Sequence, residues 1–239
     1  MDLFGDALKD CHAGVRNRML TIRRDDDHTD AHDPGLYFAD DPFEHEAKLL
    51  ELVEGPVLDV GAGAGRTTLW LQRRGIETTG IDQSPGAVAG ARSRGCRDVR
   101  EADVLTADDD LLPQAAFRTV VLFGNNVGIG GTIEGAATLL GRLARATKQL
   151  GRLLVTGLDI ANMSAMHHLA YHARNRDRGR PIGEIKMRFE YEGTVGDWVP
   201  WFHPEPAELE DLAEATGWAF GRLVQTRDPF YAIGFEKQQ

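Results

Sequence analysis

Gly61, Gly63 and Gly65 follow directly after the apolar run 57–60, and their alternate spacing is the strongest chemical signal in this sequence. A helical pattern begins at about Gly65. Glycine tolerates positive φ and places no side chain between the backbone and a ligand. A strand, a glycine loop and a helix in succession therefore predict a site for a nucleotide-containing cofactor.

Asp82 is a second polar anchor, because it ends another apolar run, 76–82, about one strand-helix-strand step later. An acid at this spacing is suited to binding ribose hydroxyls. The nicotinamide and flavin fingerprint is Gly-x-Gly-x-x-Gly, and Arg66 stands where its third glycine is needed. The loop therefore departs from the pattern of dinucleotide-binding proteins.

The pattern Asp-x-Gly-x-Gly-x-Gly, from Asp59 to Gly65, resembles motif I of the class I S-adenosylmethionine-dependent methyltransferases. The resemblance extends in order of elements from about Tyr37 to Glu236. It implies S-adenosyl-L-methionine as the cofactor. It also implies a Rossmann-like α/β fold, with a seven-stranded, mostly parallel sheet of order 3-2-1-4-5-7-6 flanked by helices.

The same resemblance implies roles for single residues. Asp59 would organise the loop and the methionine ammonium, Asp82 would bind the ribose diol, and Asp103 would meet the adenine amino group. Tyr37 either contacts the methionine carboxylate or packs the N-terminal segment onto the core. The predicted cofactor contacts are Tyr37, Asp59, Gly61, Ala62, Gly63, Asp82, Gln83, Asp103, Val104, Gly124 and Asn125.

The loop after the fourth strand carries Asn125 and Asn126. Amide and amine methyltransferases often have Asn or Asp followed by two prolines here, and this chain continues with Val127-Gly128. The departure argues against methylation of DNA adenine or glutamine. We expect Asn125 to line the methionine moiety and Asn126 to form the turn.

Methyl transfer depends mainly on in-line placement of the acceptor and only sometimes on a base. The candidate catalytic residues are Asp159, His168 and His203. Asp159 ends the fifth strand, where open α/β sheets bind ligands, and imidazole titrates near neutral pH. Each candidate also has a structural interpretation: helix capping for Asp159, and packing for the histidines.

No metal site is predicted. His168 and His172 share a helical face, but the sequence places no carboxylate ligand nearby. The two cysteines, Cys11 and Cys96, lie far apart and are expected to be free thiols.

Alternating strand and helix signals predict a parallel sheet covered on both faces. The chain, 1–239, is interpreted as a single domain with a helical N-terminal lid segment, 1–54, and a cap inserted after strand 5 at 160–204. The cap either covers the active site or extends a sheet for dimerisation, so a homodimer is an open alternative. A turn at 227–229 suits the hairpin of the last two strands.

Composition limits the partners. The 239 residues carry a net charge of −10, which disfavours a nucleic-acid substrate. No apolar run approaches the roughly 20 residues of a membrane span, and the acidic start does not resemble a signal peptide, so we expect a cytoplasmic protein without a membrane partner. The basic run from Arg174 to Arg188 either faces an acidic substrate group or is solvated.

These observations predict methyl transfer to an oxygen or nitrogen of a small-molecule acceptor. Two alternatives remain at this stage. One is a nicotinamide-dependent oxidoreductase, and the other is a non-catalytic protein that binds the cofactor on the same fold.

Overall fold

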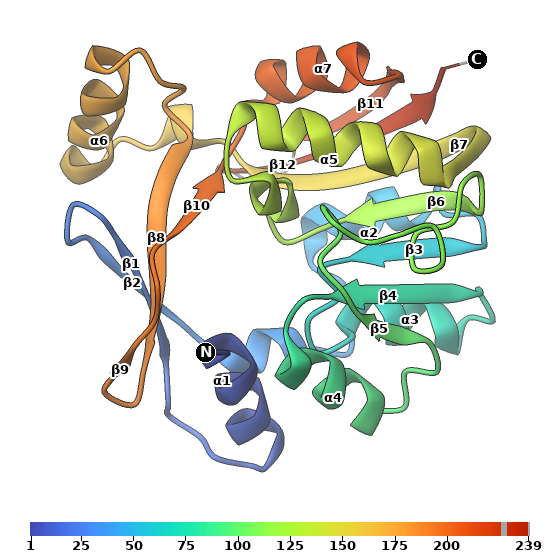
Figure 1. Cartoon of the computed structure of the whole chain (residues 1–239), viewed down its shortest axis with the longest axis horizontal. Helices are drawn as coiled ribbons and strands as arrows, with labels where there is room; N and C mark the ends of the chain where they lie inside the picture. The colour runs from blue at the N-terminus through green and yellow to red at the C-terminus, as the bar shows by residue number, and fades with distance from the viewer. Residues whose placement is uncertain (226–228, 239) are drawn as a thin grey trace.

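The computed structural model describes residues 1–225 and 229–238, which form two adjacent β-sheets (Figure 1). The strands of the larger sheet are β3 (Val57–Val60), β4 (Thr78–Asp82), β5 (Val99–Glu101), β6 (Phe117–Leu122), β7 (Thr147–Leu158), β11 (Trp218–Gln225) and β12 (Phe230–Lys237). Their order across the sheet is β11-β12-β7-β6-β3-β4-β5. Counted along the chain, this is 3-2-1-4-5-7-6, as predicted.

Strands β3 to β7 run parallel, and β12 is antiparallel to both of its neighbours. The Rossmann-like α/β class is therefore confirmed. Parallel strands covered by helices on both faces are buried on both sides, which is why four consecutive residues of β6, Thr119 to Leu122, are all buried instead of alternating with exposed ones. The predicted turn at 227–229 falls largely outside the described residues.

Helices cover both faces of the larger sheet. On one face, α5 (Ile133–Ala146) and α7 (Pro206–Ala215) pack on a core that includes Val120 and Leu122. On the other face, α2 (Glu44–Leu50) and α3 (Arg66–Arg73) pack near Val121. The helix α4 (Pro85–Ser93) packs on β5 beside them. The alternation of inward side chains along β6 thus divides the core into two layers.

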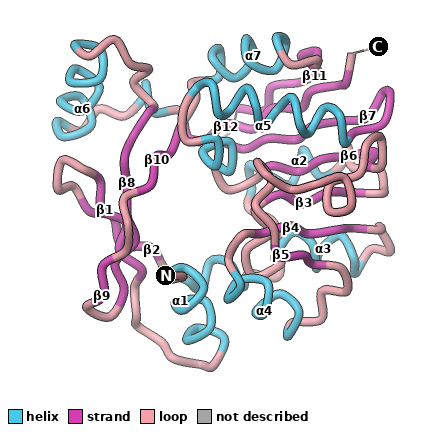
Figure 2. Tube along the Cα trace, viewed as in Figure 1, coloured by secondary structure: helices cyan, strands magenta, loops and turns pink. Residues whose placement is uncertain are grey.

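The smaller sheet contains a pairing between distant segments that was not predicted. Its strands are β1 (Leu20–Arg24), β2 (Thr29–His32), β8 (Glu184–Tyr191), β9 (Thr194–Val195) and β10 (Val199–Phe202). Their order is β10-β8-β1-β2, with β9 also paired to β8, and all pairs are antiparallel (Figure 2). A hairpin from the N-terminal segment therefore shares a sheet with the segment inserted after β7.

The segment 1–54, expected to be a helical lid segment, also contains two strands. The helix α1 (Leu3–His12), the 3-10 turn η1 (Pro34–Phe38) and α2 are helical, but residues 20–24 and 29–32 are strands. The physical reason is that β1 gains its main-chain partners from β8, which lies far along the chain. Both sides of β8 are paired within the chain, so this strand offers no free edge for dimerisation.

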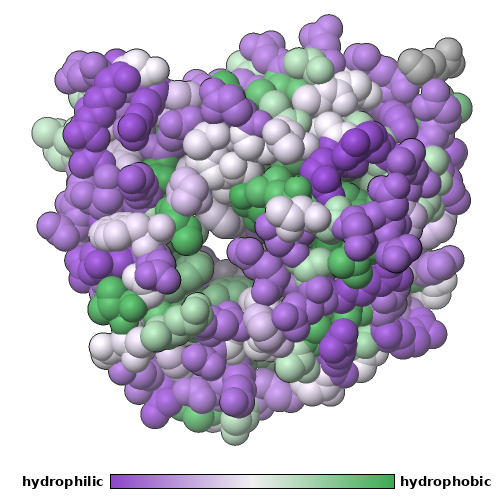
Figure 3. Space-filling model, viewed as in Figure 1, coloured by the Kyte–Doolittle hydropathy of each residue, from purple (hydrophilic) through white to green (hydrophobic). Residues whose placement is uncertain are grey.

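The helix α1 connects the two sheets. Leu3 packs with Leu20 and Tyr191 of the smaller sheet, whereas Leu8 packs with Ala64 and Ala87 next to the larger one. The smaller sheet lies opposite the carboxyl ends of β3, β4 and β6 (Figure 1). A space-filling view shows an opening between the two sheets, with apolar side chains on part of its rim (Figure 3).

The remaining elements are the turns η2 (Asn126–Gly130) and η3 (Ile160–Asn162) and the helix α6 (Met166–Asp177), which stands at the far end of the inserted segment (Figure 1). Within the described residues, no helix combines the length and apolar composition that a membrane span requires.

Candidate active site

The three glycines of the loop after β3 all have positive φ: +70° at Gly61, +55° at Gly63 and +76° at Gly65. The amides of Gly61 and Ala62 donate to the carbonyl of Ile81, at 2.8 and 3.1 Å. This pairing fixes the start of the loop against the end of β4. The conformation is one that L side chains rarely adopt, which explains the glycine at each position.

Each glycine also has its own neighbour. A Cβ on Gly61 would lie 2.2 Å from Asn126 Nδ2, and a Cβ on Gly65 would lie 2.4 Å from Cys96 Sγ. Both glycines therefore permit close packing inside the protein. A Cβ on Gly63 would lie 3.4 Å from the ring of Tyr37. Gly63 is thus the member of the three whose backbone faces the N-terminal segment.

Asp82 organises the end of β4. Its Oδ2 accepts a hydrogen bond from the Gly63 amide at 2.8 Å, and its Oδ1 accepts one from the Ser84 amide at 2.8 Å. Burial raises the pKa of Asp82, and these amides oppose that rise. A carboxylate oxygen has two lone pairs, so both oxygens can still accept hydroxyl hydrogens of a ligand. The neighbouring Gln83 is exposed.

Asp103 lies beside Asp82 at the carboxyl edge of the sheet, because the Ala102 amide donates to the Asp82 carbonyl at 2.9 Å. Its Oδ1 accepts from the Leu105 amide at 2.9 Å, which holds the turn. The side chain of Val104 belongs to the buried core. Only the backbone of Val104 is therefore in a position to meet a cofactor.

Asp59 is buried within the sheet, and its Oδ2 accepts from Thr68 Oγ1 at 2.7 Å. Burial raises the pKa of Asp59 to about 6, although the Thr68 hydrogen bond acts in the opposite direction. The bond joins β3 to α3 directly behind the glycine loop. This geometry agrees with the predicted role of organising the loop.

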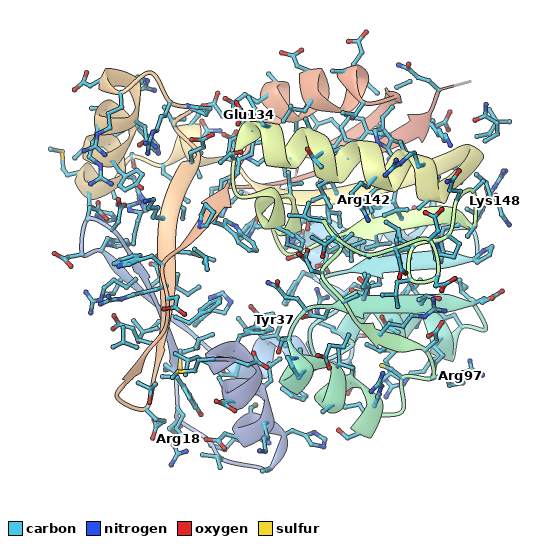
Figure 4. The ribbon with its side chains drawn as sticks, viewed as in Figure 1. Arg18, Tyr37, Arg97, Glu134, Arg142 and Lys148 are labelled. Atoms are coloured by element: carbon cyan, nitrogen blue, oxygen red, sulfur yellow. The ribbon has the colours of Figure 1, made fainter. Side chains whose placement is uncertain are left out.

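Tyr37 lies between α1 and the larger sheet (Figure 4). Its ring packs edge-to-face on Phe4, with the centroids 5.0 Å apart, and approaches Gly63. Burial raises the pKa of the Tyr37 phenol to about 12. Tyr37 therefore packs on the N-terminal helix, as one of the two interpretations of the sequence expected. The same position brings its ring next to the glycine loop.

Asn126 is a site residue whose role the sequence did not reveal. Its Nδ2 donates to the carbonyls of Val60 and Gly61, at 2.8 and 3.0 Å. It therefore couples the loop after β6 to the glycine loop, in addition to starting η2. The neighbouring Asn125 has a φ of +66°, typical of the left-handed conformations that asparagine tolerates.

Arg66 and Glu46 form a second unexpected feature. Arg66 Nη2 lies 2.6 Å from Glu46 Oε1, Nη1 binds the other oxygen, and the guanidinium stacks on the Phe43 ring at 4.2 Å. The Glu46 side chain is fully buried. This bidentate pair fixes α2 to the first residue of α3. In the sequence, Arg66 was notable only because it stands where the dinucleotide-binding fingerprint has its third glycine.

The loop after β6 leaves space beside the glycine loop. The Gly124 amide donates to Thr156 Oγ1 at 3.0 Å, and the Asn125 amide donates to the Thr156 carbonyl at 3.3 Å. A Cβ on Gly124 would meet no described atom within 4 Å. The carboxyl ends of β3, β4, β5 and β6 therefore carry the predicted cofactor contacts along one edge of the sheet.

Asp159 and His203 belong to segments that meet. The His203 amide donates to the Gly183 carbonyl at 2.9 Å, and a Cβ on Gly183 would lie 3.3 Å from Ile160 Cδ1. Asn162 Nδ2 donates to Asp159 Oδ2 at 2.7 Å. Among the described residues, neither Asp159 Oδ1 nor His203 Nδ1 has a hydrogen-bond partner, although both atoms are buried.

The surroundings of His203 set its protonation state. Burial, followed by the charge of Arg24, lowers the pKa of His203 to about 4. The imidazole is therefore neutral at pH 7, with a lone pair on one ring nitrogen, and the lowered pKa makes it a weaker base than an exposed imidazole. Asp159 makes no side-chain cap to the backbone of η3, so the capping interpretation from the sequence does not describe it.

His168 lies elsewhere. It stands at the start of α6, where its ring contacts His167 and His28, and its Nδ1 lies 3.2 Å from Arg24 Nη1. Burial lowers the pKa of His168 to about 4, and neighbouring His167 and Arg24 add to the effect. His168 therefore lies at the β1-β2 hairpin. Figure 1 shows α6 away from the carboxyl ends of β3 and β4.

The basic run divides into paired and exposed members. Arg174 pairs with Asp25 at 2.7 Å, and Arg188 pairs with Glu190 at 2.8 Å, whereas residues 176–180 are exposed. A cavity of about 370 Å³ between α6, β8 and the start of α5 is lined by several of these cations, and Glu134 is on its border (Figure 4). None of the predicted cofactor contacts lines this cavity.

Known proteins share both the loop and the fold. Residues 57–151 match the family model described as a methyltransferase domain. The structure is similar to that of an S-adenosylmethionine-dependent methyltransferase from Bacteroides fragilis in complex with S-adenosyl-L-homocysteine. The TM-score is 0.84 at 23% identity, covering 100% of this chain and 95% of that chain.

Two further solved structures are similar to a smaller share of this chain. An S-adenosylmethionine-dependent methyltransferase from Methanosarcina mazei gives a TM-score of 0.65 at 15% identity, covering 83% of this chain and 99% of that one. The CcbJ methyltransferase from Streptomyces caelestis gives 0.63 at 13% identity, covering 83% and 98%. At these identities the likeness shows the fold. The sequence matches no curated protein.

Proposed function

We propose that this chain, whose residues 57–151 are a methyltransferase domain, transfers a methyl group from S-adenosylmethionine to an oxygen or nitrogen of a small-molecule acceptor. The observation that carries the proposal is the arrangement of Asp82. Its carboxylate holds the Gly63 amide while both oxygens keep lone pairs for the ribose hydroxyls. The structure related at 100% coverage of this chain contains S-adenosyl-L-homocysteine, the product that such a transfer leaves.

The residues present fit this cofactor. Asp82 would bind the ribose diol, Asp103 would face the adenine, and the positive-φ backbone of Gly63 allows close approach. Space beside Gly124 leaves room for the methionine part. The bound cofactor supplies an electrophilic methyl group, so the chain itself has to hold the acceptor in line and exclude water.

We place the acceptor between the loop after β6 and the inserted segment 160–204. Trp201 of β10 packs against η2, where a Cβ on Gly128 would lie 2.0 Å from Trp201 Nε1. This indole therefore forms a wall next to the predicted methyl position. Phe202, in contrast, is fully buried and serves the core. The inserted segment would act as the cap of the acceptor site.

His203 is the proposed base, because its Nδ1 is buried, unpartnered within the described chain and neutral at pH 7. It would accept the proton that the acceptor oxygen or nitrogen loses as the new bond to carbon forms. Asp159, with its free Oδ1, is the second candidate. We expect His203→Gln to lower kcat at least about tenfold while the cofactor Kd changes less than about twofold.

Asp159→Asn is the variant to compare with His203→Gln. Whichever of the two variants loses more kcat identifies the residue that acts as the base. A His203 variant that weakens cofactor binding without slowing turnover would contradict this assignment and place the residue in a supporting role.

The experiment that tests the cofactor is calorimetric titration of the purified protein with S-adenosylmethionine, S-adenosylhomocysteine and NADH. We expect the two sulfur compounds to bind and NADH to leave no heat of binding. Gly63→Val should abolish binding, because the branched side chain occupies the space that the cofactor needs. Binding of NADH alone would support the oxidoreductase alternative.

Gly75→Val is the matched control, since Gly75 has a φ of +76° and a Cβ added there would meet no described atom within 4 Å. Both variants carry the backbone strain of a valine at positive φ. Only Gly63→Val should lose cofactor affinity. Equal losses in the two variants would mean that strain, and not the site, explains the effect. Cofactor binding without turnover of any tested acceptor would favour a non-catalytic protein.

A further inference from the structure

Three histidines from two distant segments meet at the outer end of the smaller sheet. His28 lies in the turn of the β1-β2 hairpin, and His167 and His168 begin α6. The ring centroid of His28 lies 3.9 Å from that of His167 and 5.4 Å from that of His168. The tip of the hairpin and the start of α6 thus face each other (Figure 1). We name these residues the histidine cluster.

The spacing of the cluster suits a metal ion. One ring nitrogen from each histidine lies within 4.8 Å of the other two. Zinc–nitrogen bonds of about 2.0 to 2.1 Å place neighbouring ligand atoms of a tetrahedral site about 3.3 Å apart. The rings of His28 and His167 are stacked in the structure, so they would have to rotate for their nitrogens to converge on one ion. Within the described chain, the buried Nε2 of His28 has no hydrogen-bond partner. A buried nitrogen without a partner is costly unless something binds it.

A fourth ligand is at hand in the same hairpin. Asp30 Oδ1 lies 3.4 Å from His28 Nε2, close to the separation of two ligands on one ion. The Asp30 side chain is largely exposed and free to turn toward an ion. Three imidazoles and one carboxylate are a donor set that divalent transition metals, zinc above all, accept.

Arg24 is the group that opposes a cation here, because its Nη1 lies 3.2 Å from His168 Nδ1. Two observations reduce this opposition. Arg24 is already neutralised by a bidentate pair with Asp26, at 2.8 and 2.7 Å, and it also donates to the His167 carbonyl. The hairpin turn adds further carboxylates at Asp25 and Asp27. Loss of one contact to His168 would therefore leave Arg24 well bound.

We propose that the histidine cluster, with Asp30, binds one divalent transition-metal ion of the zinc class. The ion would join the N-terminal hairpin to the inserted segment and so stabilise the smaller sheet from its outer end. The site is separate from the proposed cofactor site, and its role is structural. Sequence reasoning compared His168 with His172 on one helix, but the partner that completes the cluster comes from the hairpin.

The test uses the full chain without a polyhistidine tag, first stripped with a chelator and then titrated with zinc chloride by calorimetry. We expect one ion per chain. His28→Gln and His167→Gln should each weaken binding at least about tenfold. His45→Gln is the matched control, because His45 stacks on Phe230 and lies outside the cluster. It should bind zinc as the unchanged protein does.

Cobalt(II) provides a second readout that does not depend on stability. Bound in the cluster, it should give the visible absorption bands of a tetrahedral site, and His28→Gln should remove them. Zinc should also raise the Tm of the unchanged protein and of His45→Gln, but not of His28→Gln. No binding, or equal binding to His28→Gln and His45→Gln, would overturn the proposal whether or not the chain binds S-adenosylmethionine.

Discussion

Asp59 and Asp82 lie on neighbouring parallel strands, but their carboxylates have different surroundings. Asp82 accepts two backbone amides at the sheet edge and keeps lone pairs for a ligand. Asp59 is 3% exposed, and the hydroxyl of Thr68 is its side-chain partner. Burial thus makes Asp59 a connection between β3 and α3, while its position at the sheet edge leaves Asp82 able to accept the ligand hydrogen bonds that we propose for it.

The raised pKa of Asp59 predicts a pH dependence of stability. Between about pH 4 and pH 6 the folded state holds a proton on Asp59 that the unfolded chain has released, so the free energy of unfolding falls as pH rises. The shift from 3.8 to about 6 corresponds to about 3 kcal/mol, lost by pH 7. Above about pH 7 the stability no longer changes with the titration of Asp59.

Asp59→Asn tests this prediction, because the amide cannot ionise and its oxygen can still accept from Thr68. Urea unfolding at pH 4, 5, 6 and 7 should show a smaller fall in the variant than in the unchanged protein. Parallel curves for the two proteins would show that Asp59 does not titrate in this range.

At the scale of elements, the loop after β6 and the glycine loop behave as one unit through Asn126. Its amide group satisfies two carbonyls that would otherwise face each other without a donor. Only glycine fits at position 61, because the side chain of Asn126 occupies the space that a Cβ would need. The glycine pattern at this position therefore reflects packing against Asn126 as much as the needs of a cofactor.

We expect Asn126→Ala to lower the free energy of unfolding by about 1 to 3 kcal/mol, because it leaves the carbonyls of Val60 and Gly61 without their donor. Cofactor affinity should fall as well, since the loop loses its support. Urea unfolding and calorimetric titration measure the two effects. The exposed Thr138→Ala, which removes one hydroxyl bond on α5, is the control. Unchanged cofactor affinity in Asn126→Ala would separate this residue from the site.

At the scale of the molecule, α1 links the sheet that carries the cofactor loop to the sheet that faces it. Phe4 is the central contact: its ring stacks on Phe189, with centroids 6.0 Å apart, and also packs on Tyr37. Asp2 adds a polar anchor, because its carboxylate accepts from Ser84 Oγ at the start of α4. Movement of α1 is therefore coupled to both sides of the opening.

We predict that S-adenosylmethionine slows amide hydrogen exchange in residues 3–12 and 34–38, because Tyr37 lies over the glycine loop that the cofactor occupies. Phe4→Ala should weaken this protection by removing the contact between α1 and Tyr37. Amide hydrogen exchange followed by mass spectrometry measures this protection. Phe220→Ala, an exposed aromatic on β11, is the control. Full protection in Phe4→Ala would show that α1 is not part of the lid segment.

Local patterns in the sequence were sufficient to predict the strands of a parallel sheet and the glycine loop with Asp59 and Asp82, whereas the strand order and the place of Asp103 came from the family resemblance. These patterns are apolar runs that form buried strands, and glycines where the backbone needs positive φ. The family resemblance extended the same local motifs to the cofactor. Each of these signals lies within a few residues and needs no knowledge of distant contacts.

Only the folded structure showed which distant segments of the chain lie together. The smaller sheet, the pair Arg66-Glu46, the bond from Asn126 to Gly61 and the histidine cluster all join residues far apart in the chain. Burial is likewise a property of the folded chain, and it distinguishes the supporting Asp59 from the ligand-facing Asp82. Side-chain partners and solvent exposure depend on packing between elements, which a local pattern in the sequence does not specify.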